Sequence, residues 1–316
     1  MENLQTSVHF ERKRAELAAY ECAIQNPLTI GLVQEAVRHG TLTLVLGAGV
    51  SSGLGLPQWE PLIESIYRDV YSSIYPGGDL GFVGSAKKLY SSAVMVRHIE
   101  SLIGFSSNAR EILRRKLYEN FDSSGYYHLI RPICEYFLAR SLRNPVRHVI
   151  SYNFDNVLEL CMHDAGEHGV STVYSSATYP IHKDGVTIFH PHGYIPHPDE
   201  PGEFDFDEPV VFSEVDYNLH YMDPSHWANV LQLHHFMNRS CLFIGTSLSD
   251  PNTRRLLDHA RHRTGRLNRH ISIQRLKSDK MLNAFIERDL KSLGVTPLWV
   301  EEYADIQKVL GICSRY

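Results

Sequence analysis

Residues 41–59, which read TLTLVLGAGVSSGLGLPQW, decide the fold of this chain. The β-branched and aliphatic run that ends at Leu46 predicts a buried strand, and the glycines that follow permit a sharp turn which a ligand can approach closely. Backbone N–H groups at the start of a following helix would face a pyrophosphate, whose negative charge the helix dipole favours. The dinucleotide fingerprint is incomplete, because Ser52 replaces its third glycine and Gly53 comes one residue late. A tight strand-to-helix turn without a ligand is the alternative.

Bulk composition is that of an ordinary globular protein. The chain has 316 residues, of which 43% are hydrophobic and 21% charged, enough for one large domain or one domain with an insertion. The net charge of −5 gives no overall attraction to nucleic acid or to an anionic membrane. No segment approaches the roughly 18 apolar residues of a membrane span, and the first residues lack the apolar run of a signal peptide. We therefore expect a cytoplasmic protein.

The cysteines and paired histidines predict no metal site. The five cysteines are scattered without a C-x-x-C pair, which argues against a disulfide framework and against a cysteine zinc site. We expect them to be small buried hydrophobic residues. His234 and His235 are adjacent, so on a helix they point in different directions, and no carboxylate or cysteine completes a ligand set.

Strand-like and helix-like segments alternate along most of the chain. This pattern predicts an α/β fold with a doubly wound, mostly parallel, Rossmann-like sheet and a helical insertion. We expect N-terminal helices over 1–40, a nucleotide-binding domain over 41–76 and 145–316, and a helical insertion over 77–144 that covers the site. Strands are predicted at 41–46, 147–152, 171–174, 186–190, 209–212, 241–244, 271–274 and 296–300. Helices are predicted at 8–25, 29–39, 57–75, 154–168, 251–263, 280–293 and from 304 onward.

Polar residues follow three further strands and should meet the glycine turn at one sheet edge. The strand over 147–152 delivers Asn153 and Asp155; Asn153 can orient a water or a ribose hydroxyl, and capping the next helix is the simpler role for Asp155. The strand over 186–190 leads to His192, which can accept a proton near neutral pH. We expect His190 to be a buried, hydrogen-bonded neighbour. The strand over 241–244 runs into Gly245-Thr246-Ser247, whose N–H and hydroxyl groups suit a phosphate or ribose.

In this order and spacing, the motifs resemble those of the sirtuin (silent information regulator) family from about Leu42 to Arg255. They are Gly47-Ala48-Gly49-Val50-Ser51, Gly55-Leu56-Pro57, Asn153-x-Asp155, His192-Gly193 and Gly245-Thr246-Ser247. The resemblance implies an NAD-binding domain in which Asn153, Asp155 and His192 are catalytic. It further implies that the dinucleotide is bound by Gly47, Ala48, Gly49, Ser51, Pro57, Gly245, Thr246 and Ser247.

Two departures separate this chain from the protein deacylases of that family. Tyr152 stands where the deacylases have glutamine, and no cysteine lies between Cys161 and Cys241, where their zinc ribbon would be. The helical insertion and the phrase from Phe212 to Tyr217 are similar to the bacterial antiphage-defence branch, whose members hydrolyse NAD. The resemblance thus implies an NAD hydrolase without a metal, with NAD as its substrate. An NAD-dependent deacylase and a non-catalytic NAD or ADP-ribose sensor are the alternatives.

A toxic NAD hydrolase should be restrained until it is triggered, so we expect regulation by a homo-oligomer, by the helical insertion or by a separate activating protein. By resemblance to related defence systems, a HerA-like ring ATPase is one candidate. The densest basic tract holds six arginines, for which a solvated helix face is the simplest role and an oligomer contact or a phosphate-bearing ligand are alternatives. Its arginines are Arg254, Arg255, Arg261, Arg263, Arg266 and Arg269.

Overall fold

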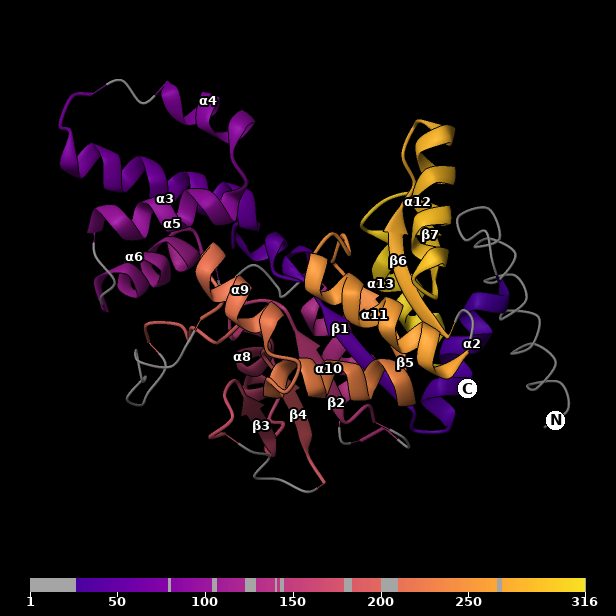
Figure 1. Cartoon of the computed structure of the whole chain (residues 1–316). Helices are drawn as coiled ribbons and strands as arrows, with labels where there is room; N and C mark the ends of the chain where they lie inside the picture. The colour runs from indigo at the N-terminus through magenta and orange to yellow at the C-terminus, as the bar shows by residue number, and fades with distance from the viewer. Residues whose placement is uncertain are drawn as a thin grey trace, which may run out of the picture.

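In a computed structural model of the chain, a parallel sheet lies at the centre with helices around it (Figure 1). The structure describes residues 27–78, 81–103, 107–122, 129–139, 141–142, 145–178, 184–199, 210–265 and 269–315. The predicted helix over 8–25, Cys22, Pro209 and Arg266 lie outside the described residues.

Seven strands form one sheet in the order β3-β4-β2-β1-β5-β6-β7, and every pairing between neighbours is parallel. The predicted α/β, doubly wound, Rossmann-like class is therefore confirmed. The strands are β1 Leu42–Leu46, β2 His148–Ser151, β3 Val170–Val173, β4 Val186–Phe189, β5 Ser240–Ile244, β6 His270–Arg275 and β7 Val295–Val300.

The strand order places a topological switch point beside β1. From β1 the chain builds β2, β3 and β4 on one side, and it then crosses to the other side of β1 to build β5. Leu46 at the end of β1 is in register with Ser151 of β2 and with Ile244 of β5. The loops that follow these three strands therefore leave the sheet at the same edge, where open α/β sheets bind their ligands.

Side chains of β1 alternate between two separate hydrophobic cores, one on each face of the sheet. In β1, Leu44 and Leu46 belong to a core shared with α2, α3, α8 and α13, whereas Val45 belongs to a second core shared with α10 and α11. This two-fold alternation is the period of a strand, and it allows helices to cover both faces. The helices are α2 Pro27–Arg38, α3 Trp59–Ile74, α4 Phe82–Leu89, α5 Ser92–Ile103, α6 Ser107–Tyr118, α7 Ile130–Ile133, α8 Val157–Asp164, α9 Glu214–Met222, α10 Trp227–Asn238, α11 Pro251–Thr264, α12 Lys280–Ser292 and α13 Asp305–Cys313.

Within 77–144, the regular elements that the structure describes are helices, joined by turns. Helices α4, α5 and α6 pack with α3 beyond one side of the sheet, in the upper left of Figure 1. The following α7 continues into a π-helical turn over Cys134–Leu138, and these two elements pack against α8. Among the described residues, no helix is both long enough and apolar enough to span a membrane.

One expectation about the elements was wrong. The helix predicted over 57–75 is α3, and the glycine-containing loop before it holds two short 3-10 turns, at Ala48–Val50 and Ser52–Leu54. Residues 210–212 form no strand, although their apolar character predicts one. Their backbone donors are used elsewhere: the N–H of Val211 donates to the carbonyl of His192, and that of Phe212 donates to Asp216.

Candidate active site

The two glycine-containing loops after β1 and β5 pack directly on each other. The N–H of Gly49 donates to the carbonyl oxygen of Gly245 at 2.9 Å, and that of Gly47 donates to Ile244 at 3.0 Å. A Cβ atom on Gly49 would lie 2.8 Å from the Gly245 oxygen, and one on Gly245 would lie 2.6 Å from the nitrogen of Val50. Contact between two backbones is therefore sufficient to require glycine at these positions.

Several N–H groups of the first turn are already engaged within the chain. Besides Gly47 and Gly49, Val50 donates to the carbonyl of Gly47 and Ser51 to that of Ala48, at 3.0 and 3.3 Å. The bonds of Val50 and Ser51 belong to the 3-10 turn at Ala48–Val50, and those of Gly47 and Gly49 reach the neighbouring loop. Those four donors do not point freely at a ligand, so pyrophosphate binding by this turn stays a prediction.

Ser51 joins two of the candidate catalytic residues by hydrogen bonds. Its hydroxyl accepts from Nδ2 of Asn153 at 3.1 Å and donates to Oδ1 of Asp155 at 3.2 Å, and all three residues are buried. The side-chain oxygen Oδ1 of Asn153 is buried and has no hydrogen-bond partner in the structure. A buried polar atom without a partner is costly, so a ligand that donates to this oxygen would be stabilised here.

Asp155 both caps the next helix and takes part in the Ser51 network. Its Oδ1 accepts from the N–H of Val157 at 3.2 Å, as the capping interpretation expects, although the N-cap residue of α8 is Asn156. Burial raises the pKa of the Asp155 carboxyl to about 6, while the bonds from Val157 and Ser51 oppose that shift. The carboxylate is thus close to its titration point at physiological pH.

His192 lies in the loop after β4, partly exposed, against aromatic side chains. Its ring centroid is 5.0 Å from that of Tyr152 and 6.4 Å from that of Tyr217 on α9. Withdrawal from water lowers the pKa of the His192 imidazole below its usual value, and the attraction of Asp250 opposes this only in part. A neutral imidazole can accept a proton, so the environment suits a general base.

The remaining predicted binding residues lie near the same edge with their own local contacts. Thr246 accepts the N–H of Leu248 at 3.2 Å, and the hydroxyls of Ser247 and Ser249 are 2.7 Å apart. Asp250 caps α11 by accepting from Thr253, so its role is the expected turn-and-cap role. Pro57 lies between the second 3-10 turn and α3, and it is partly exposed.

Two tyrosines near the site were missed by the sequence analysis. Tyr217 on α9 faces His192, and its buried hydroxyl has no hydrogen-bond partner in the structure. Tyr118, at the end of α6, donates to the carbonyl of Ile195 at 2.7 Å and contacts Asn156 at 3.0 Å, which ties the helical segment to the site loops. Of the two, only Tyr217 had a signal in the sequence. Ser213 and Asp216 have the spacing of a capping box, and the structure shows this box at the start of α9, which places Tyr217 on the first turn of the helix.

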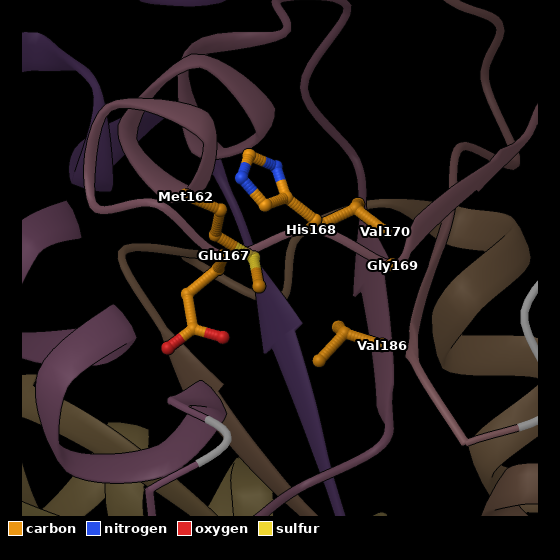
Figure 2. Close-up of a pocket in the computed structure, with 6 residues that line it drawn as sticks. All are labelled: Met162, Glu167, His168, Gly169, Val170 and Val186. Carbon is orange, nitrogen blue, oxygen red and sulfur yellow. The ribbon is translucent and has the colours of Figure 1, made fainter.

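A shallow pocket lies away from this edge (Figure 2). Figure 2 shows it beside Val170 and Val186, which are the first residues of β3 and β4, and so at the opposite ends of the strands from His192. Within the described ranges, no cluster of three or more histidine, cysteine or acidic side chains is arranged to hold a metal ion. The four cysteines that the structure describes are buried and unpaired by disulfides: Cys134, Cys161, Cys241 and Cys313.

Four arginines of the basic tract make contacts within the chain. Arg254 forms a bidentate ion pair with Asp289, and Arg255 lies over the ring of Tyr221. Arg261 donates to the carbonyl of Ser292, and Arg269 donates to carbonyls at the end of α10. These contacts leave fewer guanidinium groups for a phosphate than the sequence alone indicates.

Comparison with models of protein families gives a match for part of the chain. No curated protein matches the chain. A family model described as a SIR2-like domain matches residues 147–298, which span from just before β2 to β7 and include Asn153, Asp155, His192 and Gly245. The glycine turn after β1 precedes the matched region. This match supports a sirtuin-like family for the chain, and NAD-related activity in general fits it.

Proposed function

We propose that this chain is an NAD glycohydrolase that cleaves NAD into ADP-ribose and nicotinamide. The observation that carries the proposal is the side-chain amide of Asn153. Its nitrogen Nδ2 donates to the hydroxyl of Ser51, and its oxygen Oδ1 is buried without a hydrogen-bond partner in the described part of the chain. A ribose hydroxyl is a donor that would satisfy this oxygen. The SIR2-like match over residues 147–298 supports the choice of NAD over other dinucleotides.

In this proposal the residues position the ribose and a water rather than attack it covalently. Cleavage of the nicotinamide–ribose bond builds positive charge on the ribose, so a strong nucleophile is unnecessary. Asn153 orients a ribose hydroxyl or the attacking water, and His192, kept neutral by desolvation, accepts the proton that is released. Asp155 holds the Asn153 amide through Ser51.

The loops after β1 and β5 would bind the rest of the dinucleotide. We assign this binding to the switch point of the sheet, where both loops leave the same edge. The proposed domain division is 41–76 with 145–316 for the NAD-binding domain, 77–144 for the helical insertion and 1–40 for the N-terminal helices. The residues proposed to contact NAD are Gly47, Ala48, Gly49, Ser51, Pro57, Gly245, Thr246 and Ser247.

We further propose that the physiological role is antiviral defence by depletion of cellular NAD. Such an enzyme requires restraint, so a homo-oligomer or an activating ATPase of the HerA-like kind would control it. The apolar residues exposed on α9 and α12 are available to such contacts; they include Leu219 and Met222 on α9, and Met281 and Phe285 on α12.

The proposal is tested by mass spectrometry of nucleotides from cells that express the chain with its genomic neighbours. Wild-type protein should deplete NAD and accumulate ADP-ribose and nicotinamide, whereas Asn153→Ala and His192→Ala should not. Loss of a positioned acid–base group typically slows a reaction on the order of 10²–10⁴-fold. Full depletion by either variant would refute the site assignment.

A second assay separates the two alternative functions. Purified protein is incubated with NAD, with and without an acylated peptide. Product that forms only when peptide is present would identify a deacylase. NAD that binds measurably and stays intact, also in any activated assembly of the protein, would identify a sensor. Hydrolysis independent of peptide is the result that we expect.

A further inference from the structure

His190 forms a buried bridge between the loop after β2 and the helix that follows it. The residue comes directly after β4 and is fully buried. Its Nδ1 lies 2.9 Å from the backbone oxygen of Asn153, and its Nε2 lies 2.9 Å from Oε1 of Glu159 on α8. Both ring nitrogens therefore have a partner, and one of the partners is the main chain of the residue proposed to hold the ribose.

The chemistry of the two partners determines the protonation of the ring. A backbone carbonyl can only accept, so Nδ1 carries a proton, and a carboxylate oxygen at 2.9 Å favours a second proton on Nε2 and a positive charge on the ring. Burial disfavours that charge, but attraction to Glu159, its hydrogen bond and the Asn153 carbonyl outweigh burial and raise the pKa of His190. Asp155 adds a smaller attraction from the loop, and the ring of Tyr194 packs edge-on at 5.0 Å.

The bridge completes the immobilisation of Asn153. The N–H of Asn153 donates to Ser151 at 3.3 Å, its carbonyl accepts from His190, and its side-chain Nδ2 donates to Ser51. Its side-chain oxygen Oδ1 has no partner among the residues that the structure describes. Three contacts from three different elements thus leave one acceptor of this residue available to a ligand.

We propose that His190, held by Glu159, is a positioning residue that clamps the main chain of Asn153 and so aims its side-chain oxygen at the substrate. Its kinetic consequence rests on the proposed NAD hydrolysis, whereas the clamp itself does not. Glu159 is suited to this task because its Oε1 is also held by the hydroxyl of Thr172 on β3 at 3.3 Å. The carboxylate is thereby fixed between α8 and the sheet.

Three variants of the full chain separate the clamp from general stability. Glu159→Gln can preserve both bonds around a neutral ring, with Nδ1–H donating to Asn153 and the glutamine amide donating to Nε2. Glu159→Leu removes that partner, and Thr172→Val removes only the support from β3. We expect kcat for NAD cleavage to fall on the order of 10- to 100-fold in Glu159→Leu, with KM less affected, and to remain near wild type in the other two.

Nuclear magnetic resonance of the ring nitrogens of His190 supplies a readout that does not require activity. In the wild type we expect a doubly protonated ring at pH 7, and in Glu159→Gln a neutral ring that keeps its proton on Nδ1. A wild-type ring that titrates like an exposed histidine, or one with its proton on Nε2 alone, would overturn the clamp, as would full kcat in a folded Glu159→Leu. If the wild-type protein cleaves no NAD, the proposed function fails, but the spectra of His190 still test the clamp. The spectra of the wild type and of Glu159→Gln also test it when Glu159→Leu does not fold.

Discussion

Removing the Ser51 hydroxyl should disturb both the stability and the pH dependence of the protein. This hydroxyl is the link between Nδ2 of Asn153 and Oδ1 of Asp155, and Ser51 is only 1% exposed. Ser51→Ala leaves an amide donor without a partner and deprives the carboxylate of one of its two donors. Asn153 and Asp155 are also buried, so bulk water compensates poorly for the lost bonds.

The magnitude follows from the groups left unpaired. A buried polar group that loses its partner costs about 1–3 kcal/mol, so the two affected groups together should lower the free energy of unfolding by about 2–4 kcal/mol. Ser52→Ala is the matched control, because the exposed Ser52 donates only to the carbonyl of Gly49. A surface change of this kind typically alters stability by less than about 0.5 kcal/mol.

Urea unfolding of the two variants measures the stability difference, and the pH profile of NAD cleavage measures the effect on the site. The Ser51 bond lowers the pKa of Asp155, so Ser51→Ala should raise it above about 6. If the ionised carboxylate is the active form, the wild type loses activity as pH falls through about 6, and the variant loses it at higher pH. Equal stability of the two alanine variants, or an unchanged acid limb, would refute this reasoning.

Two further predictions concern stability. Nδ1 of His235 is hydrogen-bonded to the hydroxyl of Thr43, and Nδ1 of His270 accepts from the N–H of Cys241. Burial lowers the pKa of each ring to about 3, so both rings are neutral in the folded protein near neutral pH. An unfolded histidine binds a proton below about pH 6.5, so acid lowers the free energy of unfolding. Near pH 5 each of the two rings should lower it by about 2 kcal/mol. Glutamine at either position should therefore make the stability measured by calorimetry depend less on pH. Gly245→Ala should destabilise the protein by more than about 2 kcal/mol, since it adds a 2.6 Å backbone clash to an unfavourable φ of +68°. Gly265→Ala is the control, because Gly265 has a φ of +59° but open space around it, and it should cost only about 1 kcal/mol. Equal losses of stability in Gly245→Ala and Gly265→Ala, measured by thermal unfolding, would contradict the packing of the two loops.

The sequence predicted the sheet well because buried parallel strands are continuous apolar runs bounded by small or polar residues. The run that ends at Leu46 and the segment from Cys241 to Ile244 became β1 and β5, and parallel topology then required that their loops meet. The run over 210–212 has the same apolar character but forms no ladder. The N–H of Val211 donates to the carbonyl of His192, and that of Phe212 donates to Asp216 of the α9 capping box. The apolar pattern of these residues does not reveal these acceptors.

The candidate site was predictable only in outline. Strand ends identified Asn153 and His192, but the link through Ser51 depends on how the 3-10 turn directs that hydroxyl. The pairing of His190 with Glu159 depends on the register of α8 against the sheet, across 31 positions of sequence. A ligand role was predicted for Gly47, Gly49 and Gly245 and stays a prediction; the structure adds a second reason for glycine at these positions, the close contact between the two loops.

The most direct test of the account is NAD cleavage in water enriched with oxygen-18. Purified full-length chain, with its activating partner where one is found, is incubated with NAD, and the products are resolved by mass spectrometry. We expect equal amounts of nicotinamide and ADP-ribose, one labelled oxygen in each ADP-ribose, and no turnover by Asn153→Ala. Turnover that survives in Asn153→Ala, or NAD that binds the wild type and stays intact in its activated assembly, would contradict the central claim.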